Sequence, residues 1–292
     1  MRKKILSLLL ITTMSLSIVG CSEKAKPNNN DASKQTVNDT NGTSDTNDEN
    51  ETKDTELDND YLLSLPETTA EDFIYEELDD GTIWINKYRP RNYDKNAIVV
   101  VPTKIDGKIV SVIGAEAFWN KELKAVVVKG DVKKIGGDAF TSAKIDKLLI
   151  TAPLKELTKS VFMLAKIKEI VLPETLEIVN AASIVSAKIE TLIIPKNVKI
   201  IESGAFSLSK IDKIIIEGDC ESQGAFLGSD KIGKVIFKTG NVVLNNEDGD
   251  FLTTSGALNG TNEKTNTILV APKGSKVEEY ANKYGLNFEV LE

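Results

Sequence analysis

Nearly the same nine residues occur four times in this chain, each copy beginning 22 residues after the one before. The copies read SAKIDKLLI at 142–150, LAKIKEIVL at 164–172, SAKIETLII at 186–194 and LSKIDKIII at 208–216. A fixed period in the twenties is typical of a solenoid, in which each coil buries its apolar side chains only against the coils beside it. The repeat therefore predicts a stack of equivalent coils.

Two columns of apolar residues define each coil. The first follows the spacing L-x-x-L-x-L with any aliphatic residue, and its last three positions alternate as in a strand with the L positions on one face. We expect these strands to stack in parallel about 4.8 Å apart. The second column reads Phe118, Phe140, Phe162, Ile184, Phe206 and Phe226. The fold class predicted is mostly β (α/β by some schemes): a leucine-rich-repeat solenoid with short helical turns at the Ala-Phe positions.

A doubly wound α/β sheet is the competing fold, because runs such as KIII resemble strands that are buried on both faces. About 16 residues separate one strand from the next, which is just enough for a crossover helix. Glycine and proline interrupt these connections, as in VLPETL and IIPKNV, so short turns are favoured.

The chain resembles the BspA-like leucine-rich repeats of bacterial surface proteins. VIGAEAF, KIGGDAF and IIESGAF carry the resemblance, together with IVLPETLEIV and LIIPKNVKII. The flanks are similar as well: EDFIYEELDDGTIWINKY resembles the leading hairpin, and ILVAPKGSKVEEYANKYG resembles the closing strand and helix. The pattern departs from the family at Val161 and Ile184. The resemblance implies surface display and protein binding or adhesion, with no catalytic residues.

The repeats place the domain boundaries. We predict a lipoprotein signal peptide at 1–20, a disordered acidic tether at 21–60, an N-terminal capping hairpin and first strand at 61–108, repeats at 109–239 and a C-terminal cap at 240–292. Asp80-Gly81 is a hairpin turn signal. In the C-terminal cap, Ser275 and Glu278 have the capping-box spacing, and Gly285 suits a left-handed helix end.

The first 21 residues predict export and an anchor. Three basic residues precede an apolar run, and Ile18-Val19-Gly20-Cys21 resembles a bacterial lipobox, which implies lipidation of Cys21. The alternative is plain secretion, with Cys21 incidental. Residues 22–60 hold 11 acidic residues against 4 lysines and no aromatic residue, so they cannot bury enough surface to fold. We expect an extracytoplasmic protein, lipid-anchored to the bacterial cell membrane and exposed at the surface.

The composition excludes several kinds of chemistry. The chain has no histidine, which rules out His-dependent triads and His-ligated metal sites. A net charge of −8 argues against nucleic-acid binding. The S-x-x-K match at 207–210 is explained by the repeat, and NNEDGD at 245–250 fails the EF-hand spacing, although a weak ion site there stays open. Cys220 aligns with aliphatic residues and is interpreted as a small buried apolar residue. We expect no enzyme activity, cofactor or metal.

Two surface columns are candidate contacts. The first is a column of lysines just before the strands: Lys144, Lys166, Lys188, Lys210 and Lys231. These lysines either lie in a solvated turn, where acids two residues further on neutralise them, or form a docking edge for an acidic partner or glycan. The second is the outward-facing strand set Val127, Leu149, Val171, Ile193, Ile215 and Ile236, with Lys147, Lys213 and Lys234 beside it. A contiguous exposed apolar strip usually marks a contact surface.

The predicted function is therefore a protein-interaction or adhesion module that binds a protein or glycan at the cell surface through the concave sheet. The alternative is a structural or self-associating envelope protein that forms a homodimer through the same strip. An enzyme acting on cell-wall polymers is disfavoured, because no pair of acids stands out at a predicted cleft.

Overall fold

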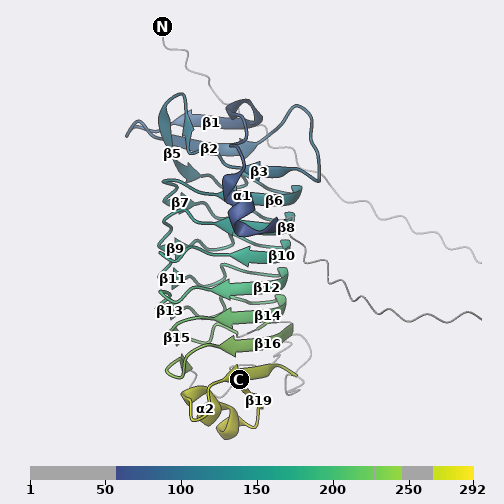
Figure 1. Cartoon of the computed structure of the whole chain (residues 1–292), viewed down its shortest axis with the longest axis vertical. Helices are drawn as coiled ribbons and strands as arrows, with labels where there is room; N and C mark the ends of the chain where they lie inside the picture. The colour runs from purple at the N-terminus through teal and green to yellow at the C-terminus, as the bar shows by residue number, and fades with distance from the viewer. Residues whose placement is uncertain (1–56, 227, 230, 245–265) are drawn as a thin grey trace, which may run out of the picture. The chain divides into compact units, whose positions relative to one another are not determined.

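Figure 1 shows a computed structural model of the chain, which describes residues 57–226, 228–229, 231–244 and 266–292. All of these belong to one compact unit, Thr52–Glu292. The predicted signal peptide, Cys21, most of the predicted tether and the sequence NNEDGD at 245–250 lie outside the described residues.

One sheet of nine strands runs through the repeats, and all of its pairings are parallel. In spatial order its strands are β3 (Ile98–Val100), β6 (Glu122–Val128), β8 (Lys144–Ile150), β10 (Lys166–Val171), β12 (Lys188–Ile194), β14 (Lys210–Ile216), β16 (Lys231–Phe237), β18 (Ile268–Ala271) and β19 (Asn287–Val290). Equivalent repeat positions face each other, as Leu148, Ile170, Leu192 and Ile214 do. The predicted stack of coils is confirmed.

Two smaller sheets complete the coils. Short parallel strands form the second sheet in the order β17 (Val243–Leu244), β15 (Glu221–Ser222), β13 (Ile200–Ile201), β11 (Ile178–Val179) and β9 (Glu156–Leu157). The third sheet contains β1 (Phe73–Glu77), β2 (Ile83–Tyr88), β5 (Lys108–Ile113), β4 (Lys104–Ile105) and β7 (Lys134–Ile135). Figure 1 shows the long strands and the short strands on opposite sides of the stack.

The connections at the Ala-Phe positions are turns, where short helical turns were predicted. The helices of the described residues are α1 (Asn59–Ser64), η2 (Ala70–Asp72) and α2 (Lys276–Tyr284), and none lies between β6 and β16. Asp138 (φ 62°) and Ser142 (φ 58°) flank Phe140 in the left-handed region, which ends any helical run. The Phe140 amide instead donates to the Val161 carbonyl of the next coil at 3.0 Å. The doubly wound alternative is wrong, because no crossover helix connects the parallel strands from β6 to β16.

The phenylalanine column forms the centre of the core. All six of its side chains are at most 1% exposed. The rings of Phe118 and Phe140 stack with centroids 5.1 Å apart, and those of Phe140 and Phe162 lie 5.6 Å apart. Each coil therefore covers the apolar side chains of its neighbour, as the repeat predicts.

Caps close both ends of the stack. The β1–β2 hairpin turns at Gly81 (φ 79°), and the Asp80 carboxylate accepts the Thr82 amide at 2.9 Å. At the other end, the Ser275 hydroxyl accepts the Glu278 amide, and Gly285 ends α2 in the left-handed conformation, as predicted. The Glu278 carboxylate accepts the amide of Gly274, one residue before the N-cap.

The predicted boundary at residue 60 differs from the structure. Asp58 caps α1 by accepting the amides of Asp60 and Tyr61, so the helix begins inside the segment predicted as tether. The leucines on either side of Asp58 pack on the sheet.

Candidate functional site

Helix α1 covers part of the outward face of the nine-stranded sheet (Figure 1). Leu62 is 0% exposed and packs in a cluster with Val100, Ala125, Val127 and Leu149 from β3, β6 and β8. Leu57, Leu63 and Leu65 are partly buried against the same cluster. The sheet face therefore already holds a short leucine-rich segment of its own chain.

Polar contacts hold this segment in place. The Thr68 amide donates to the Val100 carbonyl at 2.9 Å, and the Val100 amide donates to the Thr68 hydroxyl at 3.1 Å. The Lys129 ammonium donates to the Leu63 carbonyl near the end of α1 at 3.2 Å. These contacts fix α1 at one end of the sheet.

The six predicted strip residues fall in one register column, with each paired to the next. Their exposure differs along the column. Val127 and Leu149 are buried beneath α1, so they are not available to a partner as the sequence prediction assumed. The open strip, as we call the remainder, is partly exposed and consists of Val171, Ile193, Ile215 and Ile236. Three strand spacings make it about 14 Å long.

The predicted lysines lie in the adjacent column, but their environments differ. The Lys147 side chain is 11% exposed and pairs with Glu169 at 3.1 Å. Lys234 pairs with Glu289 at 2.7 Å. Lys213 is exposed on β14. The positive charge of the predicted lysines is therefore partly neutralised. Lys213 is the predicted lysine best placed to meet an acidic group.

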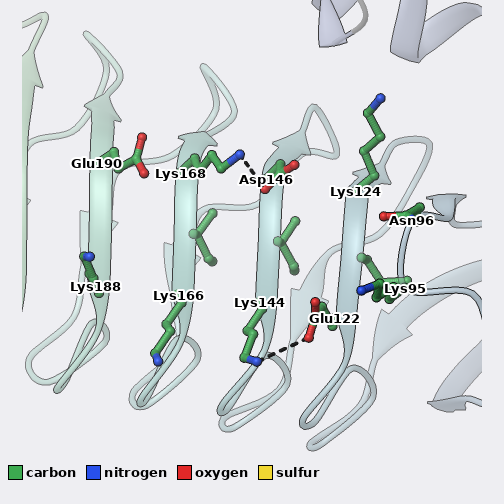
Figure 2. A pocket seen from close by; sticks show the side chains of 13 residues that line it. Lys95, Asn96, Glu122, Lys124, Lys144, Asp146, Lys166, Lys168, Lys188 and Glu190 are labelled. Atoms are coloured by element: carbon green, nitrogen blue, oxygen red, sulfur yellow. Dashed lines mark hydrogen bonds and ion pairs between the residues drawn. The ribbon is translucent and has the colours of Figure 1, made fainter. Parts of the chain in front are cut away.

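A groove of about 320 Å³ lies where β6, β8, β10 and β12 begin (Figure 2). Two rows of charged side chains border it. The lysine row is Lys144, Lys166, Lys188, Lys210 and Lys231, in consecutive register, and its first three members line the groove. The mixed row, two residues further along each strand, is Lys124, Asp146, Lys168 and Glu190.

The charges pair between neighbouring coils. Lys144 pairs with Glu122 at 3.2 Å, and Lys168 pairs with Asp146 at 3.0 Å (Figure 2). One explanation from the sequence was that each lysine is neutralised by the acid two residues further along its own strand. In these two pairs the acid instead lies on the neighbouring coil. Lys166 and Lys188 are exposed and have no acidic partner within the part of the chain that the structure describes.

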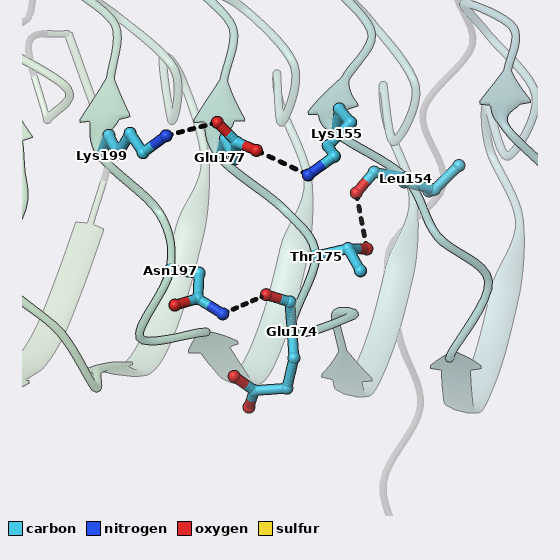
Figure 3. A network of polar contacts seen from close by, with 7 residues as sticks. All are labelled: Leu154, Lys155, Glu174, Thr175, Glu177, Asn197 and Lys199. Atoms are coloured by element: carbon cyan, nitrogen blue, oxygen red, sulfur yellow. Dashed lines mark hydrogen bonds and ion pairs between the residues drawn. The ribbon is translucent and has the colours of Figure 1, made fainter.

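A second polar cluster lies beside the short strands (Figure 3). The Glu177 carboxylate accepts from Lys155 at 2.6 Å and from Lys199 at 2.5 Å. These two hydrogen bonds, with the attraction of both positive charges, lower the pKa of Glu177 to about 2. Both lysines lie 22 residues from Glu177, so the cluster ties three consecutive coils together and has the character of a structural contact.

Cys220 is buried and free, and burial, followed by the negative charge of Asp219, raises its pKa to about 12. This agrees with its interpretation as a buried apolar residue. No group of three potential metal-ligating side chains occurs in the described ranges. Among the helices described, none is long and apolar enough to span a membrane.

Comparison with protein families matches residues 103–212 to the BspA type leucine rich repeat region, in 6 copies. The region similar to this family comprises 110 of the 292 residues. BspA-type repeats belong to a class whose members are typically non-enzymatic binding or surface modules. No protein of curated function matches the chain.

Several solved structures resemble the fold. A leucine-rich repeat protein of T. pallidum is 25% identical, with a TM-score of 0.42, over 60% of this chain and 87% of that one. A leucine-rich repeat protein of Bacteroides ovatus is 15% identical, with a TM-score of 0.40, over 77% of each chain. A leucine rich cell surface protein of Faecalibacterium prausnitzii is 13% identical, with a TM-score of 0.25, over 78% of this chain and 96% of that one.

The segment around α1, which covers the outward face of β3, β6 and β8, was not predicted from the sequence. Its signal is present: Asp58 is a helix-capping residue type, and leucines follow at 62, 63 and 65. A helix of 6 residues is too short for apolar periodicity to reveal, and it adjoins a strongly acidic stretch.

Proposed function

We propose that this chain is a lipid-anchored binding module of the bacterial cell surface, and that it contacts a protein partner through the open strip. The observation that carries the proposal is the run of four partly exposed aliphatic side chains in register on β10, β12, β14 and β16. Exposed contiguous apolar surface of this kind usually marks an interaction site.

The way α1 binds supports this use of the sheet. Leu62 reaches complete burial on the outward face of β3, β6 and β8, so this face accepts leucine side chains. The open strip continues the same register column beyond the helix. A partner segment with aliphatic side chains would find similar chemistry there, with Lys213 beside it for an acidic group.

The anchor rests on the lipobox-like residues that end in Cys21. Several acyl chains on this cysteine would hold the protein at a membrane far more firmly than a single acyl chain. Incorporation of a labelled fatty acid that is lost in Cys21→Ser tests this part separately. Equal labelling of the wild-type chain and the variant would contradict it.

The strip is tested with the double substitution Ile193→Asp and Ile215→Asp in the full-length chain. We expect it to abolish capture of the partner from cell-wall extract or host matrix, while far-UV circular dichroism stays unchanged. The matched control is Leu164→Asp with Leu208→Asp, because these side chains are 51% and 62% exposed and lie in the turns. Equal capture of the partner by the wild-type chain and by both double variants would refute the open strip as the binding site.

Self-association through the open strip is the alternative outcome of the same experiment. If the strip joins two copies, the wild-type chain would sediment as a dimer at concentrations of tens of micromolar, and Ile193→Asp with Ile215→Asp would make it monomeric. A monomeric wild-type chain would disfavour this alternative.

A further inference from the structure

We propose that the groove at the beginning of β6, β8, β10 and β12 binds a linear anionic polysaccharide, with its charged groups on the lysine row and its hydroxyls on the mixed row (Figure 2). This site is separate from the open strip and does not depend on it. Its proposed partner is a polysaccharide, whereas the partner proposed for the open strip is a protein.

The charge of the groove favours an anion. Six lysines and three carboxylates line it, in a chain whose net charge is −8. Two of the negative charges, on Glu122 and Asp146, are already paired. Lys95, Lys166 and Lys188 line the groove, are exposed and have no acidic partner in the described ranges, so they are cations that an incoming anion would meet.

The regular spacing of the lysine row favours a polymer. Its members occupy equivalent positions on neighbouring parallel strands, which are about 4.8 Å apart. The row continues past the groove through Lys210 and Lys231. A chain with one anionic group per unit can therefore place successive charges on Lys166 and Lys188 and continue along the row beyond them, as a small anion cannot.

The mixed row favours a sugar polymer over an acidic peptide. Asp146 and Glu190 provide carboxylate acceptors opposite the lysine row (Figure 2). A uronic acid has a carboxylate at one edge and hydroxyl donors at the other, and it can satisfy both rows. An extended acidic peptide rises about 3.4 Å per residue and directs alternate side chains to opposite sides, so its same-side carboxylates recur about every 6.8 Å and do not match lysines on strands about 4.8 Å apart.

The experiment measures binding of polygalacturonate, which has one carboxylate per sugar, to the immobilised full-length chain. The comparison ligands are fully methyl-esterified polygalacturonate and poly-L-glutamate. The test variant is Lys166→Gln with Lys188→Gln. The matched control is Lys155→Gln with Lys199→Gln, which removes the same charge from the cluster around Glu177 on the short-strand side. Far-UV circular dichroism checks that each variant is folded.

We expect the wild-type chain to bind polygalacturonate and neither comparison ligand at equal concentration. The test variant should bind about ten-fold more weakly, because each exposed ion pair contributes a factor of about 2 to 5. The control should change affinity less than about two-fold. Raising the salt from about 0.05 to 0.3 M should weaken binding, since exposed charges are screened.

Three results would overturn the proposal. If the wild-type chain does not bind polygalacturonate, the proposed site is refuted. Equal losses in the test and control variants would mean that general charge, and not the groove, attracts the polymer. Equal binding of poly-L-glutamate with the same dependence on Lys166 and Lys188 would identify an acidic polypeptide as the ligand class. None of these results bears on the open strip.

Discussion

Replacing Phe162 with alanine would remove a ring from the middle of the phenylalanine column. Phe162 is 0% exposed, and its ring centroid lies 5.6 Å from that of Phe140. Its amide donates to the Ser183 carbonyl at 3.2 Å, so hydrogen bonds to the next coil hold the backbone around the ring. The surrounding coils can therefore relax only partly into the space that the substitution leaves.

The expected cost is about 4 kcal/mol of unfolding free energy. Truncation of a buried phenylalanine to alanine typically costs about 3–5 kcal/mol, and limited relaxation raises the cost within that range. Loss of the aromatic contact with Phe140 contributes about 0.5–1.5 kcal/mol of it. For a domain of this size the midpoint of thermal unfolding should fall by roughly 8–16 °C.

Denaturant and thermal unfolding followed by circular dichroism would measure this loss. Phe162→Ile is the matched control, because Ile184 occupies the same column in the next coil, and it should cost about 1–1.5 kcal/mol. Leu164→Ala, two residues away at a side chain that is 51% exposed, should change stability by at most about 0.5 kcal/mol. A loss below about 1 kcal/mol for Phe162→Ala would refute the buried column.

Two further predictions concern titration and reactivity. Because the lysine contacts lower the pKa of Glu177 from its ordinary 4.5 to about 2, its stabilising charge is fully present above pH 4.5 and is lost as the pH falls towards 2. Glu177→Gln should therefore flatten the acid-induced loss of stability in that window, and curves of equal slope for both proteins would contradict the assignment. Cys220 is 6% exposed, and its pKa is raised to about 12, so a chain carrying Cys21→Ser should resist maleimide until denaturant unfolds it. Labelling of that native chain at the rate of a free thiol would show that Cys220 is accessible.

The periodic part of the fold could be predicted from the sequence because each coil makes the same contacts as the next. The spacing from Phe118 to Phe140 to Phe162 was enough to place these rings in one buried column. The same period put Ile193 and Ile215 opposite each other on the sheet. The helix cap at Ser275 could also be predicted from the sequence, because residues within one turn decide capping.

Only the tertiary structure decided which part of the strip is open. Leu62 packs on Val127 and Leu149, which follow it by 65 and 87 residues, and no repeat relates α1 to the strands that it covers. Ion pairing was equally beyond the sequence, because Asp146 reaches Lys168 on the neighbouring strand and not the lysine two residues before it. Periodicity determines which residues share a column, whereas contacts made once, across long separations in the chain, decide which members of that column face solvent.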